Sequence, residues 1–274
     1  MTVLAAIDTW PATNAAAGVV IDGTIRTHGA STRPFALASV TKPLVALAVL
    51  VAVEEGSVDL DQTAGPPGAT IRHLLAHASG LAPDGDALLA APATRRIYSN
   101  RAFEVLGDVL AEETGLPVAQ YVREAVVEPL GLSTTVLEGS PASGATSSVD
   151  DLAIVARELL APTIISPATL AAATAVAFPG LDGVLPGFGR QSPNDWGLGF
   201  ELRDAKSPHW TGANNSPATF GHFGQTGTML WVDPVAGVAL VCLTDRDFGP
   251  WAAESWPALS DAVLAEAAGG FMGR

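Results

Sequence analysis

The sequence predicts a mixed α/β fold of the α+β type, in which an antiparallel sheet is built from both chain ends and flanked by helices. Strand patterns occur in residues 16–29 and return after residue 195, whereas residues between about 66 and 184 are mainly helical. Strands at both ends with helices inserted between them imply one shared sheet and a helical subdomain. We expect residues 1–65 and 185–274 to form the sheet subdomain, residues 66–184 the helical one, and the functional site to lie in the cleft between them.

The N-terminal part contains a predicted hairpin followed by a buried helix. Residues 16–29 read as two strands around Asp22-Gly23, a dipeptide suited to the positive φ values of a tight turn. A helix should begin near Ser39 and end before Gly56, because glycine readily takes the left-handed terminating conformation. Pro43 places the helix start, since proline is tolerated in the first turn, so Ser39 should lie at or next to the N-cap.

The rest of the chain divides into helices and then strands. The predicted helices cover residues 70–78, 101–114, 117–128, 148–160 and 167–175. The sequence of residues 147–150 resembles a capping box, with a serine accepting from a free N–H and a carboxylate reaching back to the cap. Predicted strands follow in WGLGFEL, TGTMLWVD and GVALVCLTD, the last two joined by a turn at 233–237, and a helix over about 250–267 closes the chain.

Composition excludes several classes of partner. The chain has 274 residues with 14 Lys+Arg against 28 Asp+Glu, and its net charge of −14 repels nucleic acid and anionic membrane surfaces. Cys242, the one cysteine, lies in an apolar run and should be a buried core thiol. The longest apolar run, residues 43–53, is too short to span a bilayer, and the N-terminus shows no secretory signal, so we expect a cytoplasmic protein.

Ser39-Val40-Thr41-Lys42 is the first candidate for chemistry. The chain has only two lysines, and Lys42 opens its most apolar helix. Positions i and i+3 share a helix face, so the Lys42 amine can reach the Ser39 hydroxyl. Burial and the positive helix N-terminus both disfavour an ammonium, which leaves a neutral amine able to accept the serine proton. This arrangement is typical of an activated nucleophile, and a lysine that merely extends from a helix end is the alternative.

Two further motifs accompany this one: Tyr98-Ser99-Asn100 at the mouth of a helix, and His222-Phe223-Gly224 leading into a strand. With them, LASVTKPLVALAVLVAVEEGSVDLDQ and IRHLLAHASGL resemble the nucleophile region of the family of class C β-lactamases, D-alanyl-D-alanine peptidases and serine esterases. YSNRAFEVLGDVLAEETGLPVAQYV resembles its second motif, and FGHFGQTGTMLWVDPVAGVALVCLTD its third. The resemblance runs in matching order from about residue 16 to the C-terminus.

This resemblance implies a role for each matching residue. Ser39 would attack the acyl carbon, Lys42 would hold or take its proton, and Tyr98 would relay that proton to the leaving group. Asn100 would orient Lys42 and the substrate. His222, Phe223 and Gly224 would line the cleft on the substrate-binding strand. The backbone N–H groups of Ser39 and Gln225 would form the oxyanion hole.

Other patterns favour structural roles. His73 and His77 stand four residues apart, but no third ligand is apparent, so we interpret them as packing or capping residues and expect no metal. The Gly-Leu-Gly of WGLGF lacks the context of a phosphate loop and is interpreted as strand packing. No Gly-x-Ser-x-Gly elbow is present, which counts against an α/β-hydrolase. We expect no cofactor.

The sequence therefore predicts a serine hydrolase that acts through an acyl-serine on small esters or amides. β-Lactamase or D-amino-acid peptidase activity is the alternative within the same chemistry, and a non-catalytic ligand-binding or sensor protein is the alternative of another class. Phe223 has no hydroxyl to offer a substrate carboxylate, so neutral short-chain esters should be preferred to β-lactams. The expected partner is a small ester, amide or β-lactam, and the sequence does not indicate an oligomeric state.

Overall fold

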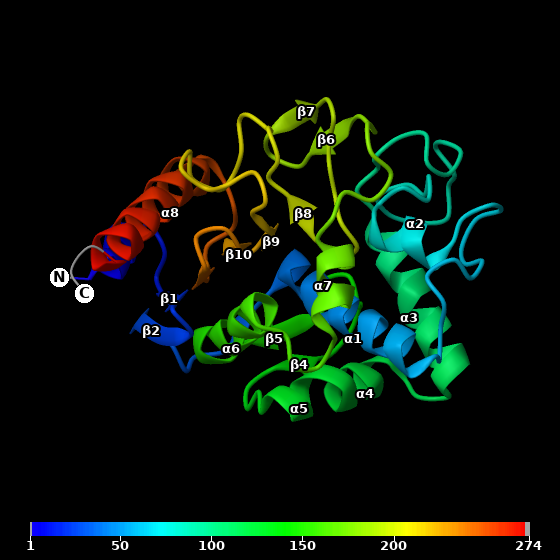
Figure 1. The fold of residues 1–274 in the computed structure, drawn as a ribbon, viewed down its shortest axis with the longest axis horizontal. Coiled ribbons are helices and arrows are strands. Elements are labelled where there is room, and N and C mark those ends of the chain that lie inside the picture. Colours follow the sequence, from blue (N-terminus) through cyan, green and yellow to red (C-terminus); the bar gives the residue numbers. More distant parts are fainter. Residues whose placement is uncertain (1, 272–274) are drawn as a thin grey trace.

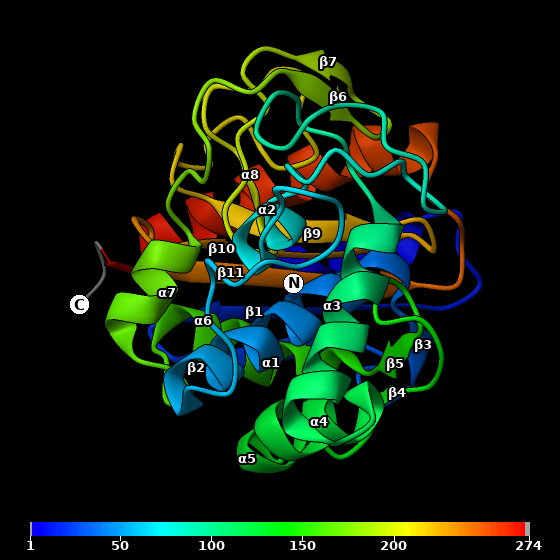
Figure 2. The ribbon, with the colours of Figure 1, turned by 90° about the vertical axis from the view of Figure 1, so that its right-hand side faces the viewer.

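The centre of the molecule is a six-stranded antiparallel sheet, seen in a computed structural model that describes residues 2–271. The strands follow the order β2-β1-β11-β10-β9-β8, so that β1 from the N-terminal end pairs with β11 from the C-terminal end. Figure 2 shows β9, β10, β11 and β1 in this order. They span Ala15–Ile21 (β1), Thr24–Gly29 (β2), Glu201–Leu202 (β8), Phe220–Gly224 (β9), Thr228–Asp233 (β10) and Val238–Thr244 (β11). The predicted sheet from both chain ends is confirmed.

Turn chemistry fixes the register of the hairpins. Asp22 and Gly23 both have positive φ, 52° and 71°, as predicted for the β1–β2 turn. Between β10 and β11 the carboxylate of Asp233 accepts hydrogen bonds from the N–H groups of Val235 and Ala236, 3.1 Å each. These local bonds fix the turn that sets the register of β10 and β11, and β10 pairs with β9 on its other edge.

Each face of the sheet buries a separate apolar cluster, because successive side chains on a strand point to opposite sides. On one face, Ala17 and Val19 pack with helix α8 (Pro250–Phe271) and the 3₁₀ helix η1 (Val3–Thr9). On the other face, Ala16 and Val20 belong to the larger cluster that includes α1 (Thr41–Glu55) and α6 (Val149–Leu160). Cys242 is fully buried in the first cluster, as predicted.

Helices occupy the region between the two strand-rich ends and lie on the side of the molecule away from both termini (Figure 1). They are α2 (Ile71–Leu75), α3 (Asn100–Thr114), α4 (Val118–Val122), α5 (Glu128–Leu130) and α7 (Pro167–Ala173). The predicted helix over 117–128 is interrupted by a π-helical turn, Arg123–Val127. The helix predicted over 70–78 ends early, since His77 takes a positive φ of 53°. Whether 66–184 forms a separate subdomain stays a prediction.

Short strands complete the fold. Three of them, Phe35–Ala36 (β3), Val136–Leu137 (β4) and Ala145–Ser147 (β5), form a small sheet, and Gly183–Leu185 (β6) pairs with Gly189–Gln191 (β7).

No helix within residues 2–271 is both long and apolar enough to cross a membrane.

Three local predictions were wrong in detail. WGLGFEL is a strand only over its last two residues, because Gly199 has a φ of 88° and its backbone lies against Ala46 and Leu75 of neighbouring helices. The cap predicted within residues 147–150 is displaced by one residue, because Ser148 caps α6 by accepting from the N–H of Asp151. The Asp151 carboxylate accepts from the backbone of the preceding loop, including the N–H of Thr134 at 2.7 Å. The closing helix, predicted to end near 267, extends to Phe271.

Candidate active site

Ser39 lies in the short 3₁₀ turn η2 (Ala38–Val40), directly before α1, so the prediction that it borders the helix N-cap is confirmed. Ala38 adopts a positive φ of 45°, a conformation that non-glycine residues rarely take. The turn is held from two sides. The Leu37 N–H donates to the carbonyl of Ala145, and the Thr228 hydroxyl donates to the carbonyl of Leu37. Strained backbone of this kind is found where surrounding contacts over-determine the conformation, and here they fix the position of Ser39.

Gly224 permits strand β9 to approach this turn closely. A Cβ atom at position 224 would lie 2.4 Å from the carbonyl oxygen of Leu37 and 3.2 Å from Cβ of Ala38. Either separation is well below van der Waals contact, so any side chain would push the strand away. The glycine of the third motif therefore brings His222 and Phe223 next to the Ser39 turn.

The Lys42 amine is buried and surrounded by three acceptors. Its Nζ lies 3.2 Å from Ser39 Oγ, 2.8 Å from Asn100 Oδ1 and 2.9 Å from the carbonyl oxygen of Ala142. Burial lowers the pKa of Lys42 from 10.5 to about 7, although the nearby carboxylates of Asp84 and Glu104 act to raise it. Near pH 7 a large fraction of the chains therefore carries a neutral amine at this position.

The donors and acceptors around Lys42 determine where the protons lie when its amine is neutral. Asn100 Nδ2 donates to Asp84 Oδ1 at 3.0 Å, so Asn100 Oδ1 faces Lys42 as an acceptor. A neutral amine has two N–H donors and one lone pair. The carbonyls of Asn100 and Ala142 can only accept, so they take both donors. The lone pair of Lys42 is then left for the hydroxyl proton of Ser39.

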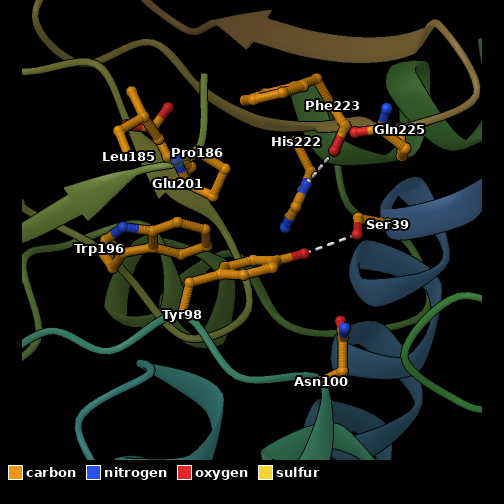
Figure 3. A pocket seen from close by; sticks show the side chains of 10 residues that line it. All are labelled: Ser39, Tyr98, Asn100, Leu185, Pro186, Trp196, Glu201, His222, Phe223 and Gln225. Carbon is orange, nitrogen blue, oxygen red and sulfur yellow. Dashed lines mark hydrogen bonds between the residues drawn. The ribbon is translucent and has the colours of Figure 1, made fainter. Parts of the chain in front are cut away.

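Tyr98 is a second side chain that contacts Ser39 Oγ. Its hydroxyl donates to Ser39 Oγ at 2.6 Å (Figure 3). Burial raises the pKa of Tyr98, so the phenol keeps its proton. The ring also lies 4.7 Å from Lys42 Nζ. A continuous path thus runs from Tyr98 O–H to Ser39 Oγ, and from the Ser39 hydroxyl to the amine of Lys42.

Neighbouring residues explain how Tyr98 is positioned. Ser99 is the N-cap of α3 and accepts from the N–H of Ala102 at 3.1 Å. The Ser99 N–H donates to Nδ1 of His77, and the His77 ring packs against Tyr98 and edge-on against Trp196. His77 therefore packs and supports the Tyr98 segment. His73, by contrast, bonds to Thr70 and lies against Phe178.

Arg96 is a further support that the sequence did not indicate. It is only 2% exposed, and its guanidinium donates to the carbonyls of Ala76, Ala177, Phe178 and Asn194. These bonds join three segments that are far apart in the chain. Arg96 itself lies two residues before Tyr98. Nothing in the local sequence distinguishes Arg96 from a surface arginine.

The polar group opens into a cavity of about 220 Å³, a size suited to a small substrate. The lining residues are Ser39, Tyr98, Asn100, Leu185, Pro186, Trp196, Glu201, His222, Phe223 and Gln225 (Figure 3). All the predicted site residues thus lie on the cavity wall except Lys42, which lies behind Ser39, and Gly224, which packs on the Ser39 turn.

Two residues of β9 point in different directions. The His222 ring lies toward Tyr98, whereas the Phe223 ring extends away from Ser39 (Figure 3). There it joins an aromatic cluster with Phe188, Phe248 and Trp256, at centroid separations of 5.1–6.0 Å. Phe223 therefore borders the cavity mainly as part of an apolar wall. The preference for neutral esters, inferred from the missing hydroxyl of Phe223, stays a prediction.

Four lining residues were missed by sequence reasoning. Trp196 and Glu201 come from the segment interpreted as one strand, and Leu185 and Pro186 from the β6–β7 hairpin. No motif surrounds them. A buried glutamate in an apolar segment was the one available signal, since such a residue is almost never buried without a partner.

The site combines a serine in the turn before a helix, a lysine on that helix, a tyrosine from the helical region and a strand of the antiparallel sheet, and this combination defines a class of proteins. The family model described as Beta-lactamase matches residues 8–265, and the chain belongs to this family. The sequence-based family assignment is confirmed.

Several known proteins and solved structures are similar to this chain. A solved structure described as a β-lactamase from Mycobacterium bovis has a TM-score of 0.96 and 59% identity, covering 97% of this chain and 99% of that one. The D-alanyl-D-alanine-carboxypeptidase/endopeptidase AmpH of Escherichia coli K12 is 30% identical over an alignment of 174 residues, with a coverage of 45% of this chain and 45% of that protein. The match thus spans less than half of that relative. EstCE1, described as a hydrolase with promiscuous acyltransferase activity, has the same fold, with a TM-score of 0.78 and 21% identity over 94% of this chain and 95% of that one.

Proposed function

We propose that the protein is a serine hydrolase that cleaves small esters or amides through an acyl-serine intermediate. The observation that carries this proposal is the position of Ser39 Oγ, 3.2 Å from Lys42 Nζ and 2.6 Å from the Tyr98 hydroxyl. Nucleophile and base within hydrogen-bond reach, with a third group orienting the base, is the arrangement that covalent catalysis requires. Membership of the β-lactamase family supports a hydrolase.

Acylation would use the proton path described above. Ser39 Oγ attacks the substrate carbonyl carbon while its proton passes to the neutral amine of Lys42. Collapse of the tetrahedral intermediate breaks the bond to the leaving group. Tyr98, whose phenol is protonated, gives its proton to the departing oxygen or nitrogen and is reprotonated from Lys42. The amine returns to its neutral form, and no proton is gained or lost overall.

Deacylation would reverse these roles. A water molecule attacks the acyl carbon and its proton is taken up by the Tyr98–Lys42 pair. The pair then delivers that proton to Ser39 Oγ as the acyl–oxygen bond breaks, so Ser39 leaves as the free hydroxyl. In both steps negative charge develops on the carbonyl oxygen. We assign its stabilisation to the backbone N–H groups of Ser39 and Gln225, two residues that lie on the cavity wall.

β-Lactamase or D-amino-acid peptidase activity is the second candidate. It is favoured by the relative from M. bovis, which is 59% identical and described as a β-lactamase, and by the weaker match to AmpH. A non-catalytic sensor is the third candidate. It would bind its ligand, or be acylated, without turnover.

Intact-mass spectrometry with p-nitrophenyl butyrate, a chromogenic cephalosporin and a fluorophosphonate distinguishes the three candidates. We expect the fluorophosphonate to add once, on Ser39, and the ester to turn over faster than the cephalosporin. Ser39→Ala is the control, because removing one hydroxyl leaves the half-buried turn otherwise intact. An adduct mapped to another serine, such as Ser79 or Ser143, would refute the assignment of the nucleophile. A stable acyl adduct without product would favour the sensor.

A further inference from the structure

The His222 ring has one nitrogen that is bonded and one that is not. Nδ1 lies 2.7 Å from the carbonyl oxygen of Phe223, and because a carbonyl can only accept, Nδ1 carries the proton. Nε2 is buried and has no hydrogen-bond partner among the described residues. It is the end of the ring that extends toward Tyr98, on the cavity side (Figure 3). Burial lowers the pKa of His222 to about 3, so near neutral pH Nε2 presents a bare lone pair.

Glu201 lines the same cavity, and its carboxylate is held in a buried ion pair. Lys206 and His209 bond to its two carboxylate oxygens, and Trp210 donates to one of them at 2.9 Å. Burial acts to raise the pKa of Glu201, but His209 and Lys206 hold it at about 2, so the carboxylate is ionised. Of this group only Glu201 lines the cavity. Lys206 and His209 are thus not among the lining residues, and the ion pair presents no cation to the substrate space.

The described lining residues offer no cation to oppose these groups. None of the ten is a lysine or an arginine. Lys42 lies behind Ser39, and its donors are directed to Asn100 and Ala142. A substrate carboxylate placed against His222 would meet a lone pair with no lining cation to balance its charge, whereas a hydroxyl or N–H would satisfy a buried acceptor that otherwise has none.

We propose that the substrate group lying against His222 is a hydrogen-bond donor, so that the enzyme prefers uncharged acyl donors carrying a hydroxyl or an amide N–H. This inference rests on the proposed acyl-serine chemistry at Ser39 and adds the class of substrate. His222 Nε2 is a specificity-determining acceptor, and its Nδ1 bond to Phe223 keeps the ring in the tautomer that accepts.

The test compares two p-nitrophenyl esters with the same carbon chain, the 3-hydroxybutyrate and the 3-methoxybutyrate, which differ by one methyl group on the oxygen that removes its ability to donate. A site built around a buried acceptor discriminates against a substrate that cannot donate by about 5-fold to 150-fold in kcat/KM. We expect that preference in the native enzyme. We expect it to vanish in His222→Phe, which removes the acceptor but keeps a ring, and to persist in part in His222→Gln, whose side-chain carbonyl accepts.

The same reaction mixtures are analysed by mass spectrometry for the acyl adduct on Ser39. Acylation of Ser39 by both esters with equal kcat/KM in the native enzyme would refute this inference and leave the proposed function standing. Equal discrimination in the native enzyme and His222→Phe would also refute it, since the preference would then come from another group. Failure of both esters to acylate Ser39 would overturn the proposed function and this inference together. If neither variant folds, the ratio for the native enzyme still decides.

Discussion

Replacement of Lys42 by methionine should change how stability depends on pH. Lys42 has a pKa of about 7 in the folded chain because it is buried, and 10.5 is its ordinary value, which applies to the unfolded chain. A base with a lowered pKa in the folded state binds fewer protons there than in the unfolded state. The free energy of unfolding contributed by Lys42 therefore rises with pH between these two values, and the contribution is least favourable below about pH 7.

The size of the effect follows from the two pKa values. At pH 7.5 burial of the amine costs about 4 kcal/mol of stability, and at pH 9.5 about 1.5 kcal/mol. Lys42→Met removes this pH-dependent cost together with hydrogen bonds to Asn100 and Ala142, whose loss does not depend on pH. The stability difference between the variant and the native protein should therefore shift by about 2.5 kcal/mol toward the native protein between pH 7.5 and 9.5.

Urea denaturation at several pH values measures this shift directly. Subtracting the native curve cancels the titration of every group that the two proteins share. Ser39→Ala is the matched control, because it keeps the amine and should follow the native protein across the range. A difference between Lys42→Met and native protein that stays constant within about 0.5 kcal/mol would mean that folded Lys42 keeps an ordinary pKa, and the case for a neutral base would be lost.

Three further predictions concern catalysis. Because only the neutral amine of Lys42 accepts a proton, kcat/KM for an ester should rise about tenfold per pH unit below pH 7 and level off above it; a flat stopped-flow profile from pH 5.5 to 8 would contradict this. Gly224→Ala should slow acylation at least about tenfold, because the added Cβ would force β9 away from the Leu37 carbonyl. Gly249→Ala is the control and should not slow it, since a Cβ there meets nothing closer than 3.8 Å. Equal acylation rates for the two variants would contradict the packing argument. Phe223→Thr should raise kcat/KM for a chromogenic cephalosporin relative to p-nitrophenyl butyrate, and an unchanged ratio would place specificity elsewhere on the wall.

The elements of the site that could be predicted are those with local signals. The Ser39–Lys42 spacing is set by one helical turn, and Pro43 and Gly56 mark the ends of that helix in the sequence itself. Ser99 caps α3, which places Tyr98 immediately outside the helix. In each case a short-range rule determines the geometry, so the sequence is sufficient.

The residues that were missed depend on contacts between distant segments. Arg96 acts through hydrogen bonds to backbone carbonyls, which leave no periodicity in the sequence. Glu201 lies in a segment whose apolar composition predicts a continuous strand, but Gly199 bends the backbone before β8 begins. Tertiary packing decides the backbone there, and with it which side chains reach the cavity.

Burial connects the stability of this protein to its proposed chemistry. Helix α1 is buried from Thr41 to Ala52, and Lys42 is its only charged residue in that stretch. Desolvation there costs folding free energy, yet the same desolvation makes the amine a base near pH 7. A substitution that admits water beside Lys42 should therefore lower the cost of desolvation and, by raising the pKa of Lys42, reduce the fraction of neutral amine near pH 7. The two properties cannot be improved independently at this position, because a single pKa determines both.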